Sequence, residues 1–426
     1  MADKVFCDPV HRHIVLEDKL RSLFLGLIDT PQVQRLRRIR QLGVSCYTYP
    51  GAEHTRFSHA LGTFHVMTQA LDTLSRSQPD LVIPEEVKIG ARCAALLHDV
   101  GHGPFSHLTE RVSKISHEGI TRKVVLEDTH VTQVLKSFSS TMPDLVGSLL
   151  FDENREWHFV SDLLSSELDV DRMDYILRDA YCCGVPLGVY DYLRILHTLR
   201  VQDYLGDGLR HPIWLEKGQH SVEGMLYARF HMYWAVYYHP TTCGYEALYD
   251  AILKRSIEVR DKVDFLPGIR ELLTGAADLA EYLFLDDSIM LAQIQLWRKC
   301  GDHVLADLCG RFLDRKGFKP FGPVDLDPGG VFHDACARKF LKQKGLPPAY
   351  YLLSRKMVAV AYNYYQPDPE AKKGIWLRIG ERCEEISRAM AGVHALIEAP
   401  RRQCYYYIPR EHEDGLTKIL SPLLRK

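Results

Sequence analysis

The sequence predicts a mainly α-helical protein with a smaller C-terminal lobe that combines helices and strands. Apolar residues recur every three or four positions through most of the first 260 residues, which is the period of an amphipathic helix. Proline and glycine interrupt this pattern in residues 318–330. Beyond the interruption, the runs 357–362 and 374–379 have the composition of strands. We therefore predict a helical core, residues 1–265, and a C-terminal lobe, residues 266–426, which is helical first and then α+β.

Start and stop signals place the individual elements. Thr30 and Pro31 are a favourable cap and first residue for a helix that we expect to reach Gly43. Pro84 opens another helix, expected to end at His98. The other expected elements are helices near 57–71, 160–182, 219–239, 243–260 and 382–397, and a hairpin in 203–216.

The composition excludes several classes of protein. The 426 residues carry a net charge of −2, which argues against a surface that binds nucleic acid throughout. We find no run of about 18 apolar residues and no signal-peptide pattern, so no membrane span is expected. Eleven cysteines without a Cys-x-x-Cys pair are typical of reduced thiols and indicate a cytoplasmic protein.

Four residues in three short segments carry the chemistry. His59 lies in Thr55-Arg-Phe-Ser-His-Ala-Leu-Gly62, His98 and Asp99 lie in Leu96-Leu-His-Asp-Val-Gly-His-Gly103, and Asp171 follows in Leu168-Asp-Val-Asp-Arg-Met-Asp-Tyr175. Two imidazoles and two carboxylates are a typical ligand set for a divalent metal that activates water.

The adjacent pair His98-Asp99 is the most informative part of this set. Gly101 and Gly103 follow it and allow the backbone to leave helical geometry, so that both side chains can turn toward one ion. The chain holds a second pair, His333-Asp334, which no glycine follows. We expect that pair to be an ordinary polar pair near a helix start.

Asp171, Tyr175 and Asp179 are spaced four residues apart and would share one face of a helix. That face could ligate metal at one end and meet a substrate at the other. Alternatively it could be a solvated acidic face paired with Arg172 and Arg178. Asp169 and Asp174 are competing candidates for the metal, and Asp174 could instead form an ion pair with Arg178.

Together these segments resemble the HD-domain phosphohydrolases and, among them, the deoxynucleoside triphosphate (dNTP) triphosphohydrolases. The resemblance is detailed over residues 1–240, has the HD motifs within 54–180, and also includes the segments that begin at Lys4, Ile28 and Tyr49. It implies one divalent ion (Mn, Fe, Mg, Zn or Co) on His59, His98, Asp99 and Asp171, and allows an additional Mg bound with the triphosphate.

The resemblance also implies roles for other side chains. Catalytic roles fall to His102, Glu110 and His117, although Glu110 stands where vertebrate members have Asp. Substrate contacts fall to Gln41, Leu42, Arg56, His107, Tyr175, Asp179, Arg229 and Tyr237. An activating nucleotide would contact Lys4, Val5, Asp29, Gln34 and Arg37, but Cys7 replaces an Asn of that site.

The predicted function is therefore hydrolysis of dNTPs to deoxynucleoside and tripolyphosphate, by water attack at the α-phosphorus, in a homo-oligomer (dimer or tetramer). One alternative is another HD-type phosphohydrolase or phosphodiesterase. The alarmone type is disfavoured because this chain has His102-Gly103 where the motif of that type has Glu-Asp. The cyclic-dinucleotide type is disfavoured because its Gly-Tyr-Pro motif is not present. Another alternative is a nucleotide sensor or single-stranded nucleic-acid binder that uses the arginines of 35–40.

Overall fold

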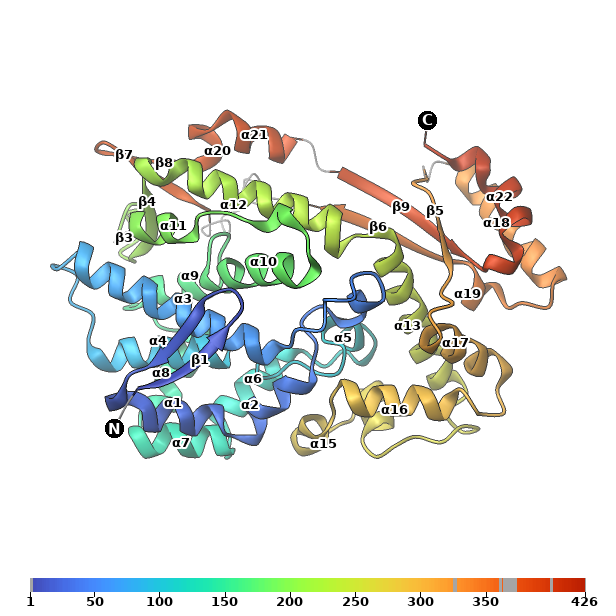
Figure 1. Ribbon diagram of the computed structural model, residues 1–426, viewed down its shortest axis with the longest axis horizontal. Coiled ribbons are helices and arrows are strands. Elements are labelled where there is room, and N and C mark those ends of the chain that lie inside the picture. The colour runs from blue at the N-terminus through green and yellow to red at the C-terminus, as the bar shows by residue number, and fades with distance from the viewer. Residues whose placement is uncertain (1–2, 325–327, 360–361, 363–373, 399–400, 426) are drawn as a thin grey trace.

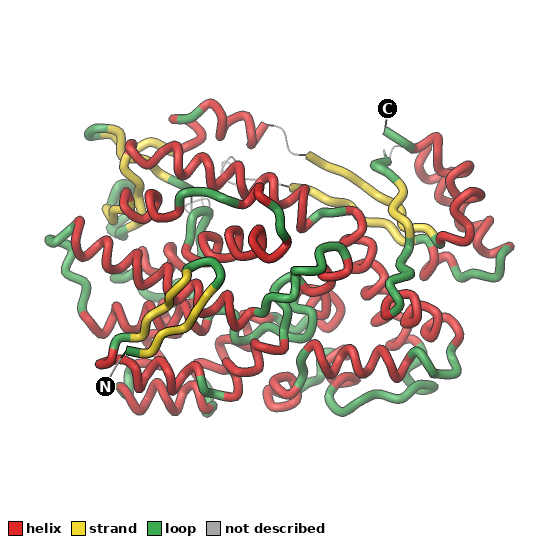
Figure 2. The backbone as a smooth tube through the Cα atoms, viewed as in Figure 1, coloured by secondary structure: helices red, strands yellow, loops and turns green. Residues whose placement is uncertain are grey.

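The computed structural model describes residues 3–324, 328–359, 362, 374–398 and 401–425, and it is mainly helical with small sheets (Figures 1 and 2). The prediction of a mainly α fold is confirmed. None of the described helices is long and apolar enough to cross a membrane.

The N-terminal hairpin and a set of helices form the core. Strand β1 (Lys4–Asp8) pairs antiparallel with β2 (Arg12–Leu16). The core helices are α1 (Arg21–Ile28), α2 (Pro31–Arg35), α3 (Arg56–Ser77), α4 (Glu85–Leu97), α5 (His107–Ser113), α6 (His117–Leu126), α7 (His130–Phe138), α8 (Met142–Leu150), α9 (His158–Leu164), α10 (Val170–Cys183), α11 (Tyr192–Thr198), α12 (Gln219–Met232) and α13 (Pro240–Glu258).

Helices α4 and α10 both pack against the long helix α3. The expected helices near 57–71 and from Pro84 to His98 are confirmed as α3 and α4, and Pro84 is the N-cap of α4. Most buried side chains of α3 are apolar, among them Leu61, Phe64 and Leu71. This packing brings the start of α3, the end of α4 and the start of α10 together.

The helix expected from Thr30 to Gly43 is shorter than predicted. Thr30 caps it as expected, but the α-helix ends at Arg35 and one 3-10 turn, Leu36–Arg38, follows. Ile39 is extended, and Arg40 bridges to Thr55 and donates its backbone N–H to Asp287. These long-range backbone contacts replace the helical hydrogen bonds.

The helix expected near 160–182 is two helices, α9 and α10, because Asp169 caps α10 by accepting from the backbone N–H of Arg172. The expected helices at 219–239 and 243–260 are confirmed as α12, which continues in a π-helical turn over Tyr233–Tyr237, and α13.

A hairpin is present, but the expected bounds 203–216 hold only its loop and second strand, because the first strand ends at Gln202. Strand β3 (Leu199–Gln202) pairs antiparallel with β4 (His211–Leu215), and the loop between them holds two glycines with positive φ. Strands β7 (Trp376–Ile379) and β8 (Arg382–Glu385) extend this sheet, and β7 runs parallel to β4. The C-terminal lobe thus adds two strands to a sheet begun by the core.

The prediction of a helix over 382–397 is wrong at its start. Gly380, with φ of 60°, turns the chain so that residues 382–385 pair with β7 as a strand. Helices α20 (Ile386–Ala389) and α21 (Ala391–Glu398) follow. The strand pairing outweighs local helical preference because it completes the sheet.

The remaining elements form the C-terminal part of the chain. They are α14 (Ile269–Thr274), α15 (Leu279–Phe284), α16 (Asp287–Trp297), α17 (His303–Leu313), β5 (Lys319–Phe321), α18 (Pro328–Gln343), α19 (Pro348–Tyr351), β6 (Leu353–Ala359), β9 (Arg401–Ile408) and α22 (Glu413–Leu420). The strands expected at 357–362 and 374–379 are confirmed as β6 and β7, while 325–327 and 360–361 lie outside the described residues. Strand β9 lies between β5 and β6. The boundary at residue 265 stays a prediction.

Candidate metal and nucleotide site

The four predicted metal ligands meet where α3, α4 and α10 come together. His59 lies in the first turn of α3, His98 caps the end of α4, and Asp171 lies in the first turn of α10. The Nε2 atom of His59 is 3.2 Å from Nε2 of His98 and 2.9 Å from Oδ1 of Asp171. Asp99 completes the cluster, with Oδ1 3.4 Å from Nε2 of His98.

The other nitrogen of each histidine is occupied by a protein acceptor. His59 Nδ1 is 2.7 Å from Oδ2 of Asp174, and His98 Nδ1 is 2.9 Å from the carbonyl oxygen of Ala95. A proton held on Nδ1 leaves the Nε2 lone pair free to bind a metal. The two imidazoles are therefore oriented as metal ligands with supporting partners.

The two carboxylates of the cluster are held in their anionic form. Burial would raise the pKa of Asp99, but His98 and Arg56 hold it well below its usual range. Burial likewise opposes ionisation of Asp171, yet hydrogen bonds with His59 and His98 lower its pKa. Two inward-facing imidazoles and two anionic carboxylates fit a divalent ion.

The two competing carboxylates have other roles. Asp169 caps α10, while Asp174 accepts from Nε and Nη2 of Arg178, the ion pair that the spacing predicted. Asp174 also meets His11 Nε2 at 2.7 Å. A Cβ on Gly62 would lie 1.8 Å from Asp174 Oδ1, so glycine is required there for Asp174 to reach His59.

The predicted catalytic histidines form a second group beside the cluster. The rings of His102 and His117 stack with centroids 3.9 Å apart, and His107 lies edge-on to both. Glu110 Oε2 is 2.9 Å from His117 Nδ1 and 3.2 Å from His107 Nδ1. Glu110 therefore orients His117 despite being one methylene longer than Asp.

His102 is the buried member of this group. Its Nε2 is 3.3 Å from Asp99 Oδ1, so it adjoins the metal cluster directly. Burial and the neighbouring Arg56 guanidinium hold the pKa of His102 well below its ordinary value. His102 is thus neutral, and His117 is the more exposed ring of the stacked pair.

A cavity of about 340 Å³ connects the two groups. His98, Asp99, Asp171 and His117 all line it, together with Asp152, which follows α8, and residues of α6 and α9. This volume is within the range of small-molecule sites. Reacting groups from both clusters can therefore reach one bound molecule.

The two predicted phosphate-binding arginines are buried and already paired. Arg56 donates to Asp99 and to the Ser106 hydroxyl, and Arg229 lies 2.6 Å from Glu167. A phosphate would compete with these carboxylates for the guanidinium groups. Glu167 was not among the expected residues.

Tyr175, Asp179 and Tyr237 form a third group. Tyr237 donates its hydroxyl to Asp179 at 2.8 Å, and His54 Nε2 meets the other oxygen of Asp179 at 2.7 Å. The Tyr175 ring is 6.3 Å from the His59 ring and 6.4 Å from the Tyr237 ring, so it lies between this group and the metal cluster.

Gln41 joins the third group through its backbone N–H, which donates to the carbonyl of His54 at 3.0 Å. Leu42 is the next residue and is partly buried. Among the described residues, Gln41 Oε1 and His54 Nδ1 are buried polar atoms without a hydrogen-bond partner. Such atoms are costly unless a water or ligand pairs with them.

The five residues predicted to contact an effector divide between two places. Lys4 and Val5 lie on β1, whereas Asp29, Gln34 and Arg37 lie around α2, where Arg37 donates to Gln34. The neighbouring arginines are paired internally: Arg35 is buried against backbone carbonyls, Arg38 meets Asp286 and Arg40 meets Glu53. This pairing disfavours a basic nucleic-acid surface.

Several residues of the site were not expected from the sequence, notably His11, His54 and Glu167. His11 and His54 both lie within segments that carried the resemblance, so a signal was present. Their partners, Asp174 and Asp179, are more than 100 positions away, and sequence spacing could not pair them. His333 and Asp334 make separate contacts, with Ile419 and Arg338, as an ordinary polar pair would.

The pairing of His54 with Asp179 predicts a loss of stability at alkaline pH. Burial lowers the pKa of His54, but Asp179 and Cys182 raise it to about 9. This stabilisation, which rests on the single hydrogen bond between His54 Nε2 and Asp179, is complete below pH 6.5 and is lost as the pH rises toward 9. Thermal unfolding from pH 6 to 9.5 should show a fall in Tm that is smaller in His54→Gln. The exposed His220→Gln should behave as wild type, and an unchanged profile in His54→Gln would contradict this role.

Comparison with known proteins identifies relatives of this chain. The HD domain family model matches residues 56–179. The chain is 36% identical to the uncharacterized protein YwfO of Bacillus subtilis, an alignment that covers 96% of this chain and 93% of YwfO. It is 30% identical to the bovine (Bos taurus) deoxynucleoside triphosphate triphosphohydrolase SAMHD1, over 68% of this chain and 53% of that protein. The chain thus spans about half the length of this relative.

A crystal structure of similar fold is that of a phosphohydrolase from Bacteroides thetaiotaomicron, with a TM-score of 0.81 and 27% identity. The match covers 96% of this chain and 100% of that chain.

Proposed function

The chain belongs to the HD-domain family of metal-dependent nucleotide phosphohydrolases, and we propose that its reaction is hydrolysis of dNTPs to deoxynucleoside and tripolyphosphate. The observation that carries this proposal is the shared cavity, which is lined by His98, Asp99 and Asp171 and also by His117. A metal held there would supply the hydrolytic water, and His117 the proton, to one bound phosphate ester.

His59, His98, Asp99 and Asp171 would hold the divalent ion, which would lower the pKa of a bound water and polarise a phosphoryl oxygen. Asp174 and the Ala95 carbonyl keep the two imidazoles in the required tautomer. An additional Mg²⁺ bound with the triphosphate is part of the proposal.

In the proposed reaction, water adds to the α-phosphorus and the bond from phosphorus to the 5′-oxygen breaks. The leaving 5′-oxygen needs a proton, and His117 supplies it while Glu110 holds the opposite ring nitrogen. Arg56 and Arg229 bind phosphate oxygens by exchanging their present carboxylate partners. His102, which is buried against Asp99, positions that carboxylate.

The group around Asp179 is proposed to hold the sugar. Tyr237 and Leu42 supply an apolar wall, Tyr175 separates it from the metal cluster, and Gln41 Oε1 offers an unpaired acceptor. A ribose 2′-hydroxyl against Leu42 and the Tyr237 ring, and not against Gln41 Oε1, would lose water without gaining a partner. The cost of roughly 1–3 kcal/mol corresponds to about 5- to 150-fold discrimination.

Tyr237→Ala should open the wall and narrow the difference between GTP and dGTP. The quantity to measure is the ratio of the two kcat/KM values, since loosening the helix near Arg229 can lower both. Tyr238→Ala is the matched control, because Tyr238 donates its hydroxyl to Val358 and not to Asp179. An unchanged ratio in Tyr237→Ala would show that the sugar lies elsewhere.

The direct test of the activity is incubation of metal-loaded protein with each of the four dNTPs and NTPs, followed by chromatography of the products. Deoxynucleoside and tripolyphosphate in equal amounts support the proposal. Release of pyrophosphate with a nucleoside monophosphate, or of orthophosphate, as the first product would contradict it. The proposal extends to a cytoplasmic homo-oligomer, a dimer or tetramer, with an effector nucleotide at residues 4, 5, 29, 34 and 37.

A further inference from the structure

A second group of metal-ligating side chains lies where α9 meets β4. It consists of His158, Asp162 and His211, whose ligand atoms all lie within 4.8 Å of one another. His158 and Asp162 are four residues apart and share one face of α9, while His211 is the first residue of β4. Asp162 and His211 are buried. None of the three belongs to the ligand set described above.

The separations within this group suit a single ion. Asp162 Oδ2 is 2.9 Å from His211 Nδ1 and 3.5 Å from His158 Nε2. Donor atoms placed 2.0–2.1 Å from a tetrahedral zinc ion lie roughly 3.3 Å apart. The pairs of His59, His98 and Asp171 span a similar interval, 2.9 to 3.6 Å. The group of His158, Asp162 and His211 therefore repeats both the donor types and the spacing of the group of His59, His98 and Asp171.

The outer nitrogen of each histidine meets a further carboxylate. His158 Nδ1 is 2.7 Å from Asp152 Oδ1, and His211 Nε2 is 3.2 Å from Asp207 Oδ2. A carboxylate on the outer nitrogen fixes a proton there and turns the other lone pair toward the ion. Asp174 supports His59 in the same way at the first cluster.

When the outer nitrogens of His158 and His211 carry the protons, the inner nitrogens of both rings present lone pairs to the Asp162 carboxylate. Lone pairs and a carboxylate oxygen repel one another unless a cation lies between them. A proton would satisfy the 2.9 Å contact with His211. It would not satisfy the 3.5 Å contact with His158, which is longer than an ordinary N–H···O hydrogen bond. One metal ion contacts all three atoms at once, so the geometry favours a metal over a proton.

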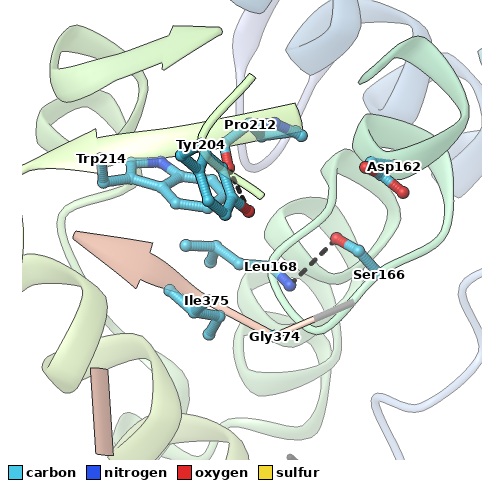
Figure 3. Close-up of a pocket in the computed structure, with 8 residues that line it drawn as sticks. All are labelled: Asp162, Ser166, Leu168, Tyr204, Pro212, Trp214, Gly374 and Ile375. Carbon is cyan, nitrogen blue, oxygen red and sulfur yellow. Dashed lines mark hydrogen bonds between the residues drawn. The ribbon is translucent and has the colours of Figure 1, made fainter. Parts of the chain in front are cut away.

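We propose that His158, Asp162 and His211 bind a second divalent ion of the zinc type, supported by Asp152 and Asp207. The ion would tie the β3–β4 hairpin to α9. Asp152 lines the cavity of the first cluster, and Asp162 borders a small cavity with Tyr204 and Pro212 (Figure 3). The second ion thus braces a wall of the substrate cavity through protein ligands and takes no part in the bond cleavage.

Metal stoichiometry in nucleotide-free protein tests this proposal. The protein is stripped with a chelator and titrated with Zn²⁺ by calorimetry and with Co²⁺ by absorption. Wild type should bind two equivalents per chain. The single variants Asp162→Asn, His158→Gln and Asp171→Asn should each bind one equivalent. The double variant Asp162→Asn with Asp171→Asn should bind none. The matched control, His220→Gln on the exposed face of α12, should keep two.

One equivalent in wild type that Asp171→Asn abolishes, or two equivalents in both His158→Gln and Asp162→Asn, would overturn the proposal. His158 is the least buried of the three ligands, so His158→Gln decides the question if the buried Asp162→Asn does not fold. Zinc should also raise the Tm of Asp171→Asn, which retains the ligands His158, Asp162 and His211. Zinc should not raise the Tm of the double variant in which Asp162 is also replaced. These readouts do not use hydrolysis, so they are independent of the proposed function.

Discussion

Asp99→Ala is expected to lose the divalent ion of the first cluster and to lower kcat by more than about 100-fold while keeping its helical content. Changes to groups that only support metal ligands already cost about 10- to 100-fold, so loss of a ligand should cost more. The variant also removes the partner of the buried Arg56 guanidinium, which should lower stability. Elemental analysis, activity and circular dichroism on the same preparation separate these effects.

The chain supplies a matched control in its other His-Asp pair. Asp334 accepts from Arg338 and Tyr406, away from both clusters. Asp334→Ala should therefore keep its metal content and its kcat. Full occupancy of the first cluster in Asp99→Ala would show that Asp99 is not a ligand.

His117→Gln is expected to lower kcat by about 10²- to 10⁴-fold with normal metal content, because a positioned general acid contributes on that scale. The loss should be much smaller for a substrate analogue with sulfur in place of the 5′-oxygen, since a thiolate leaves without a proton. A role limited to structure would lower both rates equally.

Two companion variants separate proton donation from orientation. Glu110→Gln should lower kcat by about 10- to 100-fold because it weakens the partner of His117 Nδ1, and Glu110→Asp should recover part of that loss. His130→Gln, on the exposed start of α7, is the control and should retain full activity.

The sequence predicted most helices because their apolar stripes and caps are local signals. The helix expected from Thr30 to Gly43 ended early because Arg40 bonds to Asp287, almost 250 positions away. The strand at 382–385 was missed for the same reason: its partner strand, and beyond it β4, decide its conformation. Helical period carries no information about either contact.

The candidate site was also only partly predictable from the sequence. The three segments were sufficient to identify His59, His98 and Asp171, whose ligand atoms all lie within 4.8 Å of one another, and Asp99, whose Oδ1 is 3.4 Å from Nε2 of His98. The supporting residues His11, His54 and Glu167 could not be paired with their partners from spacing. The group of His158, Asp162 and His211 was not recognised, because its first two members are an unremarked i, i+4 pair and the third lies in a different element.

The most direct test of the proposed reaction is hydrolysis of a dNTP in ¹⁸O-labelled water, with mass analysis of both products. Attack at the α-phosphorus places one ¹⁸O atom in tripolyphosphate and none in the deoxynucleoside. Label in the deoxynucleoside would place the attack on carbon. Label in pyrophosphate, orthophosphate or a nucleotide product would place it at another bond, and either result would contradict the mechanism.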